Sequence, residues 1–396
     1  MSPITLNAIS KKFCLDIVND FIKHEISYNK MIQQINIHSK SFSNDNLNNI
    51  PDYDHYPDTI QTSLNNMSKR IFTCPLNIDS RTIQLHIIYN SNISNFKEYI
   101  INIIKPIFQW LSYVSKHSNQ KCSQTLNIYL SMTPSLKLLP SSNTIINSNN
   151  ANSAFTYSCK TNNTIHVFRE EEWFKVFIHE TFHNFDLDFS KIDNKFSDKY
   201  AAEIFPLSID FRLYESYCET WATIINSIYI SYQNLYKNNT YNENNFINQL
   251  TNNLNKELNF SFFQCNKILH HFGMNYSDLF ANTEQSIFAR NNKYKEDTPI
   301  ISYFFFKTIL LFNANLFINW CINTNNNTLN FSNTNIKLHD KIILYANTIK
   351  KLRNDEFFKH IVSKNNEFIE TKDKRNINDT FYFKTLRMTT NNVFLQ

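Results

Sequence analysis

Glycine is nearly absent from this sequence, since Gly273 is the only one among 396 residues. Turns that need a positive φ must therefore be built mostly on Asn and Asp, whose short polar side chains tolerate the left-handed region. Asparagine is abundant, and a coding sequence poor in G and C would give both biases. The composition thus informs about the source genome and says little about chemistry.

The sequence also lacks paired cysteines and an apolar signal core. Its seven cysteines are scattered, odd in number and form no CxxC pair, and the N-terminal stretch MSPITLNAISKKFC contains no long apolar run. These features indicate free thiols, no signal peptide and a reducing compartment such as the cytoplasm.

No segment is strongly basic. The net charge is +5, from 39 basic and 34 acidic residues, and Lys and Arg nowhere crowd together with interleaved aromatic residues. A nucleic-acid groove needs such a patch, so we expect no nucleic-acid partner. With 42% hydrophobic and 15% aromatic residues, the chain is too apolar to be disordered and should fold as a globular protein.

The longest apolar stretch, IISYFFFKTILLFNANLFINWCI from Ile300, has the length of a membrane span but is not uniformly apolar. Polar residues interrupt it at four positions, namely Lys307, Asn313, Asn315 and Asn319. Such residues are costly inside a bilayer, so the stretch predicts a buried helix and no membrane span.

The pattern along the chain predicts three regions, 1–70, 71–235 and 236–396. The first contains one or two helices and the Asn, Pro and Asp-rich connection SFSNDNLNNIPDYDHYPD, and the third reads as mostly helical. In the second, the apolar periodicity predicts strands at 81–90, 125–132, 154–159 and 164–169 and helices at 96–117, 170–185 and from about Asp210 onward. Acidic residues 170–172 suit the positive end of a helix dipole, and Asp210 is a possible N-cap.

Within the expected helix 170–185, the stretch FKVFIHETFHNF places His179 and His183 one turn apart, with Glu180 directly after the first. Both imidazoles can then reach one metal ion, and the Glu180 carboxylate is offset so that it can meet a metal-bound water. The pattern is the zincin motif HExxH. The competing interpretation is that both histidines are satisfied core residues and that Glu180 lies on the surface.

A catalytic zinc site needs a third protein ligand. The metzincin spacing would place it six residues after His183, where the sequence has Phe189, and Asp186 replaces the glycine of that motif. The helix that carries YESYCETWA offers Glu215 and Glu219 instead, one turn apart on one face.

HExxH followed by ESYCE resembles the gluzincin metallopeptidases, which include thermolysin-like, CaaX-processing and lethal-factor-type enzymes. The resemblance implies that Glu215 is the third zinc ligand and that Glu219 is an acid that supports a ligating histidine. The reverse order stays open, and so does ligation by Cys218. Asp186 and Asp188 are expected to cap the end of the first helix or to support a ligand. If the third ligand lies elsewhere, the next residues to consider are Asp186, Asp188 and Glu203.

The resemblance covers roughly residues 71–235 and implies an α+β fold. It implies a zincin-like metallopeptidase domain with a small mixed sheet, an active-site helix and a glutamate helix, flanked by largely helical regions. A polypeptide substrate would lie along an edge strand and add to it as a further strand. The residues expected to bind it are Ala154, Phe155, Thr156 and Tyr157. The candidates for stabilising the oxyanion are His270, His271, Tyr214 and Tyr217.

The expected function is a zinc-dependent endopeptidase that hydrolyses peptide bonds with a metal-activated water and Glu180 as general base. Two alternatives stay open: an inactive zincin fold with a structural or assembly role, for instance in a virion, and a zinc hydrolase of non-peptide bonds. The aromatic-rich, Asn-rich surroundings of the motif are similar to zincin-type proteins of large DNA viruses. For such a protein the expected location is the host cytoplasm or the virion.

Overall fold

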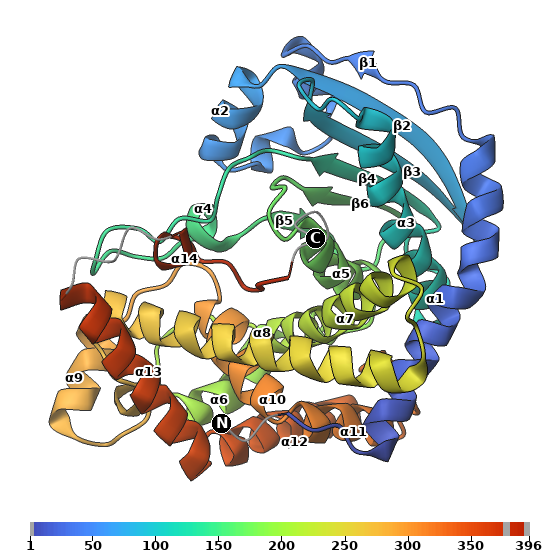
Figure 1. The fold of residues 1–396 in the computed structure, drawn as a ribbon. Coiled ribbons are helices and arrows are strands. Elements are labelled where there is room, and N and C mark those ends of the chain that lie inside the picture. The colour runs from blue at the N-terminus through green and yellow to red at the C-terminus, as the bar shows by residue number, and fades with distance from the viewer. Residues whose placement is uncertain (1–3, 375–380, 392–396) are drawn as a thin grey trace.

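Six strands form one mixed sheet in the order β1-β2-β3-β4-β6-β5 (Figure 1). The computed structural model describes residues 4–374 and 381–391. The strands are β1 (Lys40–Ser41), β2 (Lys69–Ile78), β3 (Arg81–Asn90), β4 (Thr125–Ser131), β5 (Ala154–Thr156) and β6 (Asn162–Val167). β2 and β3 pair antiparallel, β3, β4 and β6 run parallel, and β5 forms an antiparallel edge beside β6.

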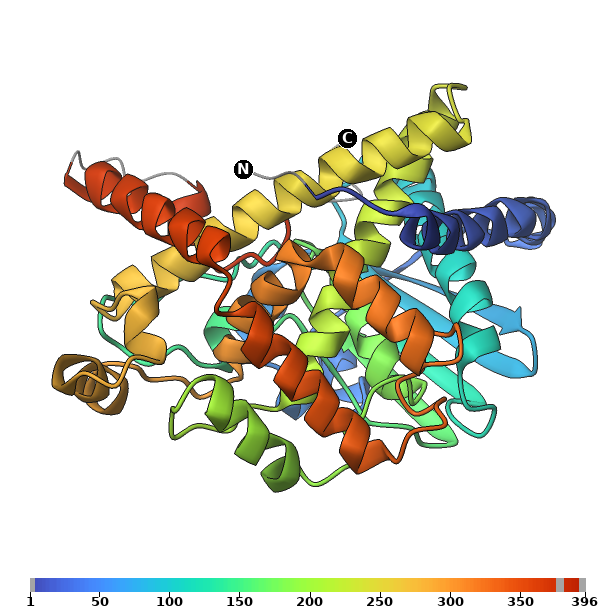
Figure 2. The same ribbon diagram turned by 90° about the horizontal axis from the view of Figure 1, so that it is seen from below.

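Helices make up most of the remaining regular structure, and the fold is therefore mixed α/β. The helices are α1 (Ala8–Gln34), α2 (Asp58–Asn66), α3 (Phe96–Val114), α4 (Ser148–Ala151), α5 (Trp173–Asn184), α6 (Asn194–Ile204), α7 (Leu213–Lys237), α8 (Glu243–His271), α9 (Glu284–Asn292), α10 (Lys307–Phe312), α11 (Ala314–Thr324), α12 (Leu338–Leu352), α13 (Glu356–Lys374) and α14 (Phe381–Lys384). α5 lies against β5 and β6, and α7 packs between α5 and α8. Seen from below, α10, α11 and α12 lie on the side of α7 that faces away from the sheet (Figure 2).

Most expected elements of the region 71–235 are present, with corrections at two helix starts. β3, β4 and α3 match the strands 81–90 and 125–132 and the helix 96–117, and β5 and β6 lie where two short strands were expected. α5 begins only at Trp173, because Glu172 before it has a left-handed φ of 60°. The acidic residues 170–172 therefore precede the helix and do not occupy its first turn. Likewise Asp210 is not the N-cap of α7, since Arg212 takes that position with a φ of 45°.

The end of α5 depends on a residue with positive φ. Asp186 has a φ of 63°, and its N–H donates to the carbonyl of His183 at 3.3 Å. The N–H of Leu187 donates to the carbonyl of Phe182 at 2.9 Å. This pair of bonds is the Schellman arrangement, in which glycine usually takes the left-handed position. Here Asp replaces glycine, as the composition predicts, and the turn brings Asp188 back beside His183.

α5 is anchored at the centre of the molecule. Each of its side chains is buried, and one buried apolar cluster contains residues from all three regions of the chain, including Phe13, Trp110 and Phe304. The indole N–H of Trp110 in α3 donates to the hydroxyl of Thr181 in α5 at 2.8 Å. Side chains on α5 therefore stand on a rigid element, which suits a site that needs fixed geometry.

The long apolar run is a broken, buried structure. Residues Ile301–Phe306 form a π-helical turn, α10 follows it directly, and α11 leaves at an angle of 93°. Among the described residues, no single helix has both the length and the apolar composition to cross a membrane, although this bent pair reaches both when its two parts are taken together. Most of the pair's side chains are buried in the fold.

Candidate metal centre

Three side-chain atoms from two neighbouring helices meet at one point. His179 and His183 come from α5, and Glu215 comes from the first turn of α7. The two Nε2 atoms are 3.1 Å apart, and Glu215 Oε2 lies 3.0 Å from Nε2 of His179 and 3.4 Å from Nε2 of His183. All three residues are buried. Their ligand atoms are close enough together to share one metal ion.

The surroundings of Glu215 Oε2 fit a cation. This oxygen is buried and makes no hydrogen bond of good geometry within the described part of the chain. A buried carboxylate oxygen without a well-aligned hydrogen bond is costly, and three electron-rich atoms this close together need a proton or a metal ion among them. The residues present therefore fit a divalent metal ion.

Each imidazole is held by a carboxylate at its other nitrogen. Nδ1 of His179 lies 3.0 Å from Oε1 of Glu219, and Nδ1 of His183 makes a short contact with Oδ2 of Asp188. Glu219 is also paired with the buried ammonium of Lys175. A carboxylate on Nδ1 fixes the orientation of the ring and leaves Nε2 as the ligand atom.

The carboxylates make the centre electronegative. Burial alone would lower the pKa of His179, but Glu219 and Glu215 outweigh burial and raise it to about 9. Burial alone would raise the pKa of Glu215, but the two histidines outweigh it and lower the value to about 2. Burial raises the pKa of Glu180 against the opposing effect of the same histidines. The field at this point therefore favours a bound cation.

Glu180 faces a cleft made of two adjoining cavities. The large cavity has a volume of about 220 Å³ and the small cavity one of about 40 Å³. Both are bordered by His179, Glu180 and Tyr303, and the large cavity is bordered by all of β5, Ala154–Thr156. Because β5 is the edge of the sheet, an extended peptide in the cleft can pair with it.

Tyr303 is a cleft residue that the sequence did not reveal. It comes from the π-helical turn, and its ring centroid lies 6.1 Å from that of His179. Burial, together with the nearby carboxylates, raises the pKa of Tyr303 well above its ordinary value. The phenol therefore stays protonated and can donate a hydrogen bond in the cleft. The sequence does not indicate this position, because Tyr303 stands in the run YFFF, which is typical of a buried hydrophobic core.

The turn that carries Tyr303 is held at its start by a partly buried acid, Glu296. The N–H of Ile301 donates to Glu296 Oε2 at 3.0 Å, and the hydroxyl of Tyr294 donates to the same oxygen. Burial raises the pKa of Glu296 from 4.5 to about 8. Between these two pH values the native state keeps a proton that the unfolded chain loses, so the contribution of Glu296 to stability falls as the pH rises.

We expect Glu296→Gln to remove this pH dependence, because the amide is neutral at every pH. As the pH rises from 5 to 8, the difference in unfolding free energy between the two proteins should shift in favour of the variant. Urea unfolding at both pH values measures this difference. Glu284→Gln changes an exposed carboxylate of α9 and serves as the control. A stability difference between Glu296→Gln and wild type that is the same at both pH values would contradict the raised pKa of Glu296.

Three of the four oxyanion candidates lie away from the cleft. Tyr217 is fully buried, and its hydroxyl donates to the carbonyl of Leu329 at 2.7 Å. His271 donates through Nε2 to the carbonyl of Thr144 at 2.8 Å. His270 lies in the same last turn of α8. None of the three candidates borders either cavity, which corrects the expectation for them.

Of the other residues expected in the cleft, all except Tyr157 border the large cavity. Tyr214 borders the large cavity, and its ring centroid lies 5.7 Å from that of His183. Ala154, Phe155 and Thr156 border the same cavity from β5. Tyr157 follows the end of β5 and borders neither cavity, so its expected role in substrate binding is not supported by its position.

The alternative third ligands lie outside the centre. Asp186 pairs with Lys191 at 2.8 Å, and the exposed Glu203 pairs with Lys350, also at 2.8 Å. Cys218 lies on the Nδ1 side of His183, with its sulfur 3.9 Å from that nitrogen. The ring nitrogen that faces the centre is Nε2, so Cys218 is on the wrong side of the ring to join the other ligands.

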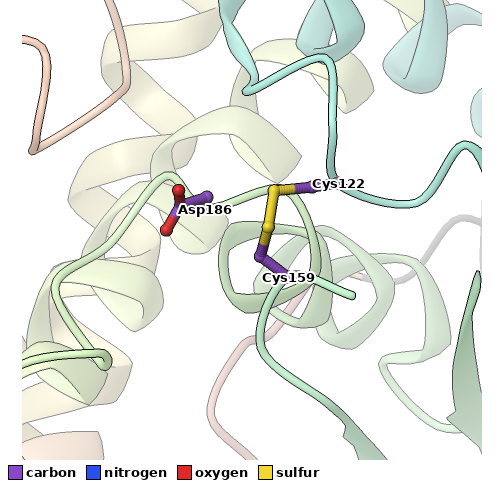
Figure 3. Close-up of side chains that lie close together, drawn as sticks. All are labelled: Cys122, Cys159 and Asp186. Carbon is purple, nitrogen blue, oxygen red and sulfur yellow. A yellow bond between two sulfur atoms is a disulfide. The ribbon is translucent and has the colours of Figure 1, made fainter. Parts of the chain in front are cut away.

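A further grouping with metal-ligand spacing contains a disulfide. Cys122 and Cys159 are bonded to each other, and Asp186 lies beside the bridge (Figure 3). This corrects the expectation that all seven cysteines are free thiols, which holds only for the other five. Bonded sulfurs are not thiolates, so this grouping offers no metal site in its oxidised form. The expected reducing compartment stays a prediction.

Comparisons with known proteins do not extend this description. No protein-family model matches the chain, and no curated protein or solved structure gives a significant match. The resemblance to gluzincins therefore depends on the residues of this chain alone.

Proposed function

We propose that this protein is a zinc-dependent endopeptidase of the gluzincin type. The observation that carries the proposal is the meeting of His179 Nε2, His183 Nε2 and Glu215 Oε2 in a cleft bordered by an edge strand. Two imidazoles and one carboxylate suit zinc, whereas magnesium and calcium prefer oxygen ligands alone.

The side chains around the centre divide the chemistry among them. A zinc ion bound there supplies a Lewis acid that lowers the pKa of a water molecule and polarises the substrate carbonyl. Glu180 accepts the proton of the attacking water and returns a proton to the leaving amine. The hydroxyls of Tyr303 and Tyr214 can each donate a hydrogen bond to the developing oxyanion. β5 aligns the main chain of the substrate.

Metal analysis combined with a peptidase assay tests the proposal. Elemental analysis of the purified protein should find about one zinc per chain, and unfolded protein substrates should be cut at internal bonds. A chelator should stop the reaction, and added zinc should restore it. A protein that holds no zinc, or one that holds zinc and cleaves no polypeptide, would contradict the proposed function.

Replacing Asp188 tests whether its carboxylate supports metal binding by His183. Asp188→Asn removes the negative charge on Nδ1 of His183 and should weaken zinc affinity by about ten- to a hundredfold. Asp186→Asn removes a charge two residues earlier that faces Lys191, and Asn tolerates the positive φ at this position. Competition with a chromogenic chelator should therefore show a much lower zinc affinity for Asp188→Asn than for Asp186→Asn. Equal affinities would exclude a supporting role for Asp188.

A further inference from the structure

Met388, in the segment 384–391 late in the chain, borders the small cavity, and buried charged groups hold the main chain at this residue. Oε1 of Glu172 accepts the N–H groups of Met388 and Thr389 at 2.7 and 2.5 Å. The ammonium of Lys307 donates to the carbonyl of Met388 at 2.9 Å. Both main-chain groups of Met388 are therefore fixed by side chains of the core.

The segment is also anchored on both sides of Met388. Before it, the N–H of Leu386 donates to the carbonyl of Lys137 at 2.7 Å. After it, Oε1 of the buried Glu257 accepts the hydroxyl and the N–H of Thr390 at 2.7 and 3.0 Å. The cavity wall at Met388 is thus a rigid part of the fold, although more than 200 residues separate it from α5 in the sequence.

The Met388 side chain limits the size of the small cavity. It is only 4% exposed, and its sulfur lies 3.6 Å from the ammonium of the buried Lys175. Val176 of α5 borders the same cavity. The small cavity has a volume of about 40 Å³, compared with about 220 Å³ for the large cavity. A methyl or hydroxymethyl group fits this space, whereas a Leu or Phe side chain overpacks it.

The position of the small cavity along β5 indicates which substrate residue reaches it. Ser153 and Ala154 border the small cavity, while the large cavity extends along β5 to Thr156. A peptide that pairs antiparallel with β5 runs from the Thr156 end towards the Ala154 end. His179 and Glu180 border both cavities, so the scissile bond lies where the two cavities meet. In this antiparallel direction the side chain that follows the bond enters the small cavity, whereas a peptide parallel to β5 would place the preceding side chain there.

We propose that the substrate pairs antiparallel with β5 and that Met388 makes the enzyme selective for a small residue, such as Gly, Ala or Ser, directly after the scissile bond. The inference rests on the proposed peptidase function and names its substrate class, which is extended polypeptide cleaved in front of small side chains. Met388 acts here as a specificity-determining residue and takes no part in the chemical step.

Peptides that differ only at the residue after the scissile bond test the proposal. With wild-type protein, kcat/KM for Ala at this position should exceed that for Leu by at least about tenfold. Met388→Ala enlarges the cavity and should reduce this ratio by about tenfold or more. Because truncation of a buried Met can impair folding, Val176→Ala enlarges the same cavity from α5 as a second variant. Met388→Leu conserves the volume and should keep the wild-type ratio.

Met274→Ala is the matched control, since Met274 is as buried as Met388 and borders neither cavity. Its Ala-to-Leu ratio should equal that of the wild type. Wild-type cleavage without preference for small residues, or an unchanged ratio in both enlarged variants, would overturn the role of Met388 and leave the peptidase function standing. A zinc-loaded wild type that cleaves no peptide would overturn the proposed function and, with it, this inference.

Discussion

Replacing Glu215 with Ala should remove zinc from the protein, whereas replacing Glu219 should weaken binding by about ten- to a hundredfold. Glu215 Oε2 lies within 3.4 Å of both Nε2 atoms, but Glu219 Oε1 lies 3.0 Å from Nδ1 of His179, on the opposite side of the ring. An ion bound to Nε2 is therefore within reach of Glu215 and out of reach of Glu219. Titration of both variants against the same chelator measures the difference.

The control variants separate loss of a ligand from loss of structure. Glu219→Ala leaves the ammonium of Lys175 buried without its carboxylate, so Glu219→Gln is the milder change to compare. Glu203→Ala alters an exposed acid far from the centre and should bind zinc like the wild type. The reverse ranking of Glu215 and Glu219 would make Glu219 the ligand. Small, equal effects would mean that zinc is not bound at this centre.

The relation between these two glutamates could be predicted because it depends on the local geometry of one helix. Residues four apart lie on one face of a helix, and this spacing alone brings His179 close to His183 and Glu215 close to Glu219. Which glutamate would be the ligand followed only from the resemblance to gluzincins. The packing of α5 against α7 places the carboxylate of Glu215 beside Nε2 of His179 and that of Glu219 beside Nδ1.

Other elements could not be predicted because their cause lies far away in the sequence. β2 contains Pro75, which ordinarily argues against a strand because it has no N–H to donate. The structure tolerates it because β1 pairs with β2 only near Arg70 and Ile71, so that β2 is an edge strand at Pro75. Tyr303 and Met388 reach the cleft through tertiary packing, and neither stands in a local pattern that indicates a site.

Glu180→Gln should leave zinc and the fold in place and lower kcat by at least about a hundredfold. The amide has nearly the shape of the carboxyl group but cannot accept the proton of the attacking water. Glu180 borders both cavities and contributes no atom to the group of three ligands, so metal content should stay at the wild-type level. Peptidase assays and elemental analysis of the same preparation measure both quantities.

The combination of these two measurements separates Glu180 from its neighbours. Loss of activity with zinc retained is the result expected of a general base, whereas loss of both would give Glu180 a part in holding the metal. Glu356→Gln changes an exposed carboxylate on α13 and should match the wild type in both assays. Wild-type turnover by Glu180→Gln would remove Glu180 as the base.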